Sequence, residues 1–106
     1  MSAAVAADLH AVRERLVKHG WVQGETRSAD GRCCILGALS EYIPPIAHRY
    51  DEPATGALRR QEVRRALWRV LPPTVEISTF NDAPGRTFAE VLALLDKAIA
   101  AEEARP

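Results

Sequence analysis

The sequence has no net charge and no long apolar run. These two absences argue against nucleic-acid binding and against a membrane protein. Its 14 Lys and Arg residues balance 14 Asp and Glu residues over 106 positions. The chain as a whole therefore has no electrostatic attraction for nucleic acid or an acidic membrane. No apolar stretch approaches the roughly 18 residues of a membrane-spanning helix. The first residues also lack the basic and apolar regions of a signal peptide, so we expect a cytoplasmic protein with no membrane contact.

Cysteine is scarce as well, and the two cysteines, Cys33 and Cys34, are adjacent. Neighbouring Cα atoms lie about 3.8 Å apart, which is less than most disulfides span. We therefore expect free thiols in a reducing compartment. Two adjacent cysteines without a third make a poor zinc site, so we expect neither a metal nor a cofactor.

Apolar side chains recur at helical spacing in four segments, which predicts four helices. The predicted helices cover residues 2–19, 35–43, 57–71 and 88 to about 103. In the first helix the apolar stripe consists of Val5, Leu9, Val12 and Leu16. Proline pairs follow the second and third helices and stop them. The Thr87-x-x-Glu90 spacing of a capping box begins the fourth helix.

Between the first two helices, the Asp30-Gly31 pair is a turn signal. It predicts a short β-hairpin with strands near residues 21–26 and 32–34. Residues 74–86 are predicted to be a loop, with a short turn near 77–80. We therefore predict one domain over residues 1–106, with an ordered core over about 3–103. Its fold should be mostly α, of the α+β class: a compact bundle of three long helices and one short helix, with a small β-hairpin between the first and second helices.

Cys34 stands where the predicted hairpin gives way to a helix. The free N–H groups of a helix N-terminus favour a thiolate, and papain-like enzymes combine such a cysteine with an upstream Gln that donates to the oxyanion. Here Gln23 would take that part, and His48 would be the base. Asn81 or Asp82 would orient His48. The alternative is a structural thiol, which we favour because free cysteine is among the most buried residue types.

A polar stretch precedes the last predicted helix. Asn81 and Asp82 can close turns on their own backbone. Arg86 stands immediately before the helix start, where a cation opposes the helix dipole. Either Asp82 pairs with Arg86, which we favour, or Arg86 and the helix start together hold an anion.

Arginine dominates the third predicted helix, with Glu62 as the opposing charge. The arginines are Arg59, Arg60, Arg64, Arg65 and Arg69. They suggest a basic face for nucleic acid, with Arg60 and Arg64 as the candidate contacts. The alternative is a solvated face neutralised by acidic residues of other helices, and the zero net charge favours it.

Three strings of the sequence carry a resemblance. They are His-Gly-Trp-Val-Gln-Gly at residues 19–24, Cys-Ile-Leu-Gly-Ala-Leu at 34–39, and Asn-Asp-Ala-Pro-Gly-Arg-Thr at 81–87, which Glu90 and Val91 follow. Together they resemble a family of small bacterial and phage proteins that is known only as a domain of unknown function. The resemblance covers roughly residues 5–100 and implies a single domain. It implies no activity, substrate or cofactor.

These patterns favour a non-catalytic binding or regulatory module over an enzyme. Its polar pocket should lie between the hairpin and the loop before the last helix, and should bind a small ligand or a protein partner. The candidate ligand-binding residues are Trp21, Gln23, Cys34, Asn81, Asp82 and Arg86. A cysteine-dependent hydrolase or transferase with Cys34 as nucleophile is the second hypothesis. Nucleic-acid binding through the arginine-rich helix is the third, and nucleic acid is the least favoured partner.

Overall fold

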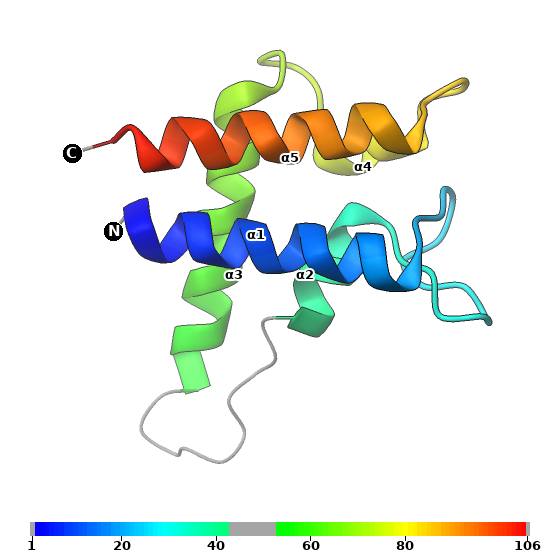
Figure 1. The fold of residues 1–106 in the computed structure, drawn as a ribbon, viewed down its shortest axis with the longest axis horizontal. Helices are drawn as coiled ribbons and strands as arrows, with labels where there is room; N and C mark the ends of the chain where they lie inside the picture. Colours follow the sequence, from blue (N-terminus) through cyan, green and yellow to red (C-terminus); the bar gives the residue numbers. More distant parts are fainter. Residues whose placement is uncertain (1, 43–52, 106) are drawn as a thin grey trace.

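Three long helices and two short ones make up the described part of the chain (Figure 1). The structure is a computed structural model that describes residues 2–42 and 53–105, with side chains over 4–40 and 58–105. The helices are α1 (Ser2–His19), α2 (Ile35–Tyr42), α3 (Pro53–Val70), α4 (Ile77–Asp82) and α5 (Phe88–Glu103). In Figure 1, α1 and α5 lie side by side and antiparallel, and α3 crosses behind both. The short helix α2 packs on α1 and on α4.

The long helices follow the local signals of the sequence. α1 has the predicted bounds, and Gly20 ends it with a positive φ of 96°, a conformation that glycine adopts at little cost. The predicted capping box begins α5: the Thr87 hydroxyl accepts from the Glu90 N–H, and the Glu90 carboxylate accepts from the Thr87 N–H. α3 begins at Pro53, earlier than predicted, because proline is tolerated in the first turn of a helix.

The core lies where the three long helices meet. The predicted stripe of α1 is buried, and Trp21 packs against the cluster that contains Leu95. The main contributions of α3 and α5 are Val63, Leu67, Val91, Leu95 and Ile99. None of the helices over residues 2–42 and 53–105 is long and apolar enough to span a membrane.

An ion pair joins each pair of the long helices. The pairs are Arg59–Asp8 between α3 and α1, Arg13–Asp96 between α1 and α5, and Arg69–Glu102 between α3 and α5. The carboxylates of Asp8 and Glu102 are buried. A buried carboxylate is tolerated only when a partner balances its charge, so these two contacts restrict how α3 can lie across α1 and α5.

The predicted β-hairpin is wrong, and with it the α+β class. No strand forms within residues 2–42 and 53–105. Two isolated bridges meet at Cys33 instead, one parallel with Trp21 and one antiparallel with Arg27. The segment between those two partners bends away from Cys33, because the Gly24 N–H donates to the Asp82 carboxylate at 2.9 Å. A contact with α4 thus takes the place of strand pairing.

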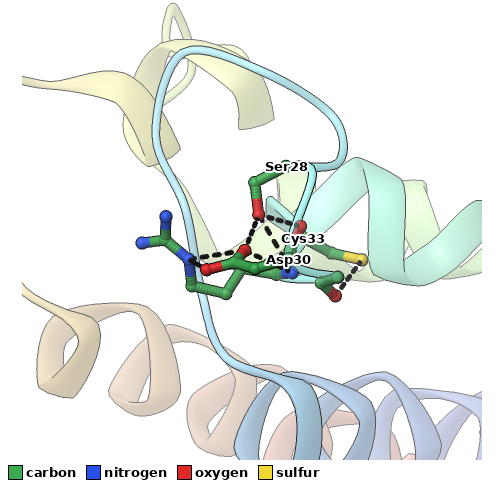
Figure 2. A network of polar contacts seen from close by, with 5 residues as sticks. Ser28, Asp30 and Cys33 are labelled. Carbon is green, nitrogen blue, oxygen red and sulfur yellow. Dashed lines mark hydrogen bonds and ion pairs between the residues drawn. The ribbon is translucent and has the colours of Figure 1, made fainter.

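The Asp-Gly turn itself is present, as a loop closed by polar side chains (Figure 2). The Ser28 hydroxyl donates to the Asp30 carboxylate, and the Arg32 N–H donates back to the Ser28 oxygen at 3.1 Å. The Arg32 guanidinium adds an ion pair to Asp30 at 3.0 Å. The hydrogen bond from Ser28 and then that from Arg32 lower the pKa of Asp30 to about 2. The loop is therefore closed by groups within five residues of one another.

Candidate functional site

The Asn81 side chain connects α4 with the loop that follows α1 and with the N-terminus of α2. Its buried side chain accepts at Oδ1 from the Trp21 indole N–H at 2.8 Å and from the Ile35 N–H at 3.1 Å. Its amide nitrogen donates to the Val22 carbonyl at 3.1 Å and to the Asp82 carboxylate at 2.8 Å. These four bonds use both amide hydrogens and both lone pairs of the oxygen. Asn81 therefore fastens residues 21–22 and the N-terminus of α2 to α4.

The next two residues of the same loop are also bonded to the end of α4. The Gln23 amide nitrogen donates to the carbonyls of Asn81 and Ala83 at 3.0 and 2.9 Å. The Gly24 N–H donates to the Asp82 carboxylate. This N–H, followed by the Asn81 amide, holds the pKa of the Asp82 carboxyl below its usual range. Asp82 is therefore a carboxylate at neutral pH.

Cys34 caps the N-terminus of α2. Its carbonyl accepts from the Ala38 N–H at 2.9 Å, and its Sγ accepts from the Gly37 N–H at 3.3 Å. Its own N–H donates to the Thr26 carbonyl. A Cβ atom at Gly37 would come within 1.9 Å of that carbonyl oxygen, so only glycine fits there. The Cys34 residue is 8% exposed, and its sulfur already serves as a hydrogen-bond acceptor.

A cavity of about 170 Å³ opens between these segments, and we call it the Cys34 pocket. Its lining consists of Gly24, Glu25, Thr26, Cys34, Leu36, Ser78, Asn81 and Asp82. The lining thus combines two carboxylates, two hydroxyls and a thiol, and it contains no cationic side chain. Glu25, Thr26 and Ser78 are exposed, and within the described residues their side chains have no hydrogen-bond partner.

The pocket gathers three of the predicted ligand-binding residues, Cys34, Asn81 and Asp82. Trp21 and Gln23 do not line it, since their side chains bond to α4 and its C-terminal end. The Trp21 ring also stacks on Phe88 of α5, with the ring centroids 6.0 Å apart. Trp21 and Gln23 therefore support the pocket wall and do not face its interior.

Arg86 lies away from the Cys34 pocket. Its Nε donates to the Phe80 carbonyl at 2.8 Å, and its guanidinium lies 3.8 Å above the Phe80 ring. Its ion pair is with Glu90 at 3.6 Å. The favoured partner, Asp82, is instead occupied by the Gly24 N–H and the Asn81 amide.

A protein-family model covers residues 1–101, and its family is described as a family of unknown function, DUF6197. The chain belongs to the DUF6197 family. The expected relationship to a domain of unknown function is thereby confirmed. No curated protein and no solved structure matches the chain. The description of the DUF6197 family states no activity.

The cysteine-enzyme residues are only partly assembled in this DUF6197 family member. Cys34 and Asn81 line one pocket, but both hydrogens of the Gln23 amide are engaged by backbone carbonyls. The Asn81 side chain has no remaining acceptor site for a histidine. His48 lies outside the described residues.

The arginine-rich helix is largely neutralised. Arg59 and Arg69 pair with the buried carboxylates of α1 and α5, and Arg65 pairs with Glu62 at 3.1 Å. Arg60 also takes part in an interaction. Arg64 has no ion pair or hydrogen bond among the described residues. Arg64 is thus the one arginine of α3 without such an interaction among the described residues, whereas a phosphate backbone needs several free cations for strong binding.

Sequence reasoning missed five pocket residues: Gly24, Glu25, Thr26, Leu36 and Ser78. Ser78 shares one helix face with Asn81 and Asp82, since the spacing i, i+3, i+4 brings side chains together. That signal depends on α4, which was predicted only as a turn. For Glu25 and Thr26 no local signal exists, because the bend around Gly24 depends on a contact with Asp82, 58 positions away.

Proposed function

We propose that the protein is a non-catalytic binding module and that the Cys34 pocket is its binding site. The observation that carries this proposal is the convergence of three separate segments, 24–26, 34–36 and 78–82, on one hollow. Binding sites are typically concave, with a partly apolar lining and a few convergent polar groups. Here Leu36 and Cys34 supply apolar surface, while exposed hydroxyls and carboxylates surround it.

The lining of the Cys34 pocket favours a ligand with positive charge. Carboxylates of Glu25 and Asp82 attract positive charge, and the hydroxyls of Thr26 and Ser78 accept hydrogen bonds. A cavity of similar size holds a molecule of about six heavy atoms. We propose a small ammonium or guanidinium group as the ligand, either free or at the end of a partner's lysine or arginine side chain.

The hydrogen bonds of Cys34, Gln23 and Asn81 favour a binding module over a cysteine-dependent enzyme. The Cys34 sulfur serves as a cap for α2, and the amides of Gln23 and Asn81 are committed to structural bonds. A catalytic role would require these bonds to break before an oxyanion or a histidine could be bound. Within the described residues neither Cys33 nor Cys34 forms a disulfide, which supports a reducing, cytoplasmic setting. A bacterial or phage origin of the family stays a prediction.

The test uses n-butylammonium and n-butylguanidinium as probes, with butyrate as the anion of matched shape. We expect saturable shifts of the Gly24, Thr26 and Leu36 amide signals in NMR spectra of the full chain. Because the ligands are fragments, the dissociation constants should be about millimolar. Butyrate should leave these signals unchanged, since the carboxylates of the lining repel it.

Two matched variants locate the binding. Ser78→Tyr should fill the pocket and abolish the shifts. Thr79 is also an exposed residue of α4 but lies outside the lining, so Thr79→Tyr should preserve the shifts. Shifts that persist in Ser78→Tyr, or no saturable shift with either cation, would refute the proposed site.

A further inference from the structure

Trp68 lies on the outer side of α3 and is not part of the hydrophobic core. Trp68 is 42% exposed, and its indole N–H has no hydrogen-bond partner among the described residues. An open hollow of about 330 Å³ adjoins it, lined by Trp68, Pro72, Pro73, Val75 and Glu76. Exposed tryptophan at a hollow is typical of the central contacts of protein interfaces.

Arg64 lies one helical turn before Trp68, so the two side chains emerge on the same side of α3. It differs from the neighbouring arginines of this helix. Arg59, Arg65 and Arg69 each pair with a carboxylate, whereas Arg64 has no such partner among the described residues. We call Arg64, Trp68, Pro72, Pro73 and Val75 together the Trp68 face.

We propose that the Trp68 face is a docking surface for an acidic segment of a partner protein. The partner's carboxylate would pair with Arg64, and an apolar side chain next to it would occupy the hollow beside Trp68. The charges of Glu76 and Arg64 fix which end of the segment lies where. Glu76 lines the hollow and would repel an acidic group there. The partner's carboxylate therefore lies next to Arg64. This surface is separate from the Cys34 pocket, and the proposal does not depend on that site.

The same charges disfavour nucleic acid on this face. A strand of phosphates spreads its charge along its length, so some phosphates would lie near the Glu76 carboxylate. Among the side chains that line the hollow, only the Trp68 indole N–H can donate to a phosphate oxygen, because proline, valine and an ionised glutamate have no side-chain donor. A segment with one acidic end and one apolar side chain fits both halves of the surface.

The experiment selects binders from displayed random peptides of about twelve residues, using the full chain as bait and counter-selecting on Trp68→Ala. The surviving pool should contain more Asp and Glu than the input pool. Synthetic copies should bind the parent and lose at least about tenfold in affinity on Trp68→Ala and about three- to tenfold on Arg64→Gln. Arg65→Gln is the matched control: it removes a neighbouring arginine that already pairs with Glu62, and should leave affinity within about twofold.

Charge reversal provides a second, independent readout. Selection on Arg64→Glu should yield a pool enriched in Lys and Arg, since attraction at that end of the face is inverted. The melting temperature of each variant establishes that it is folded. The proposal is overturned if no pool enriches, if the parent's pool is no more acidic than the input, or if a single-stranded oligothymidylate displaces the selected peptides.

Discussion

The Nε1 atom of Trp21 lies 2.8 Å from the Oδ1 atom of Asn81, although 60 positions separate the two residues in the chain. The same oxygen accepts the first N–H of α2 at Ile35. One amide thus sets the relative positions of a loop and two helices around the Cys34 pocket.

Replacing Asn81 by Ala should destabilise the protein by about 2–4 kcal/mol. The change leaves the N–H groups of Trp21 and Ile35 and the carbonyl of Val22 without their partner. Urea unfolding measures the loss. Ser78→Ala, an exposed change on the same helix, should cost under about 0.5 kcal/mol, and equal midpoints for the two variants would contradict the role of Asn81.

Arg59→Met should cost about 1–3 kcal/mol, because it leaves the Asp8 carboxylate buried without its counter-charge. The Asp8 side chain is 9% exposed, but that of Arg59 is 40% exposed, so water weakens the pair. Arg13→Met is the matched control. Its partner Asp96 is 55% exposed, and the loss should stay below about 1 kcal/mol. The double change Arg59→Met with Asp8→Leu should recover stability, and failure to do so would count against an unpaired charge as the cause.

Gly37→Ala should destabilise by about 3 kcal/mol or more, since the new methyl group meets the Thr26 carbonyl and backbone cannot give way as a side chain does. Gly85→Ala tests glycine conformation without a clash: Gly85 has a positive φ of 80°, and a Cβ there meets nothing within 4 Å. Its cost should be about 1–2 kcal/mol. Thermal or urea unfolding that ranks Gly85→Ala as the more damaging change would show that Thr26 does not lie against α2.

Asp30→Asn should remove a contribution to stability that depends on pH. The pKa of Asp30 is lowered from 3.8 to about 2 in the folded state, so its hydrogen bonds stabilise the fold above the unfolded pKa and are lost as pH falls through about 2. The difference in melting temperature between parent and Asp30→Asn should therefore be constant above about pH 5 and should shrink between about pH 4 and 2. Ser28→Ala removes the largest cause of the lowered pKa and should move this window to higher pH. A difference that grows on acidification would reverse the assigned sign.

Cys34 should alkylate slowly in the folded protein. In a chain carrying Cys33→Ser, iodoacetamide should label Cys34 much faster in denaturant than in buffer, because the residue is buried and its sulfur accepts from the Gly37 N–H. Rapid labelling of the native chain near pH 6–7 would favour the cysteine-enzyme hypothesis instead. Cys34→Ser keeps an acceptor for α2 and should remain folded, which provides protein for binding assays without the thiol.

Three of the residues predicted to bind a ligand, Asn81, Asp82 and Cys34, are polar or reactive groups at the ends of predicted elements. All three line the Cys34 pocket, and their role in binding stays a prediction. The predicted ion pair between Arg86 and Asp82 is wrong. Sequence proximity suggested Asp82 as the partner of Arg86, whereas the start of α5 places Glu90 one turn away on the same face.

Local patterning by itself determined α1, α2 and α5, because apolar periodicity, glycine ends and capping boxes act within a few residues of one another. Only the tertiary structure decided the path of residues 21–34. An Asp-Gly turn between short β-prone segments predicts a hairpin, yet strand pairing is marginal at that length, and hydrogen bonds to α4 replace it. The helix α4 itself is only six residues long, too short to be stable in isolation. It owes its place to packing and to the Asn81 contacts, and the pocket beside it exists because three segments distant in sequence share those bonds.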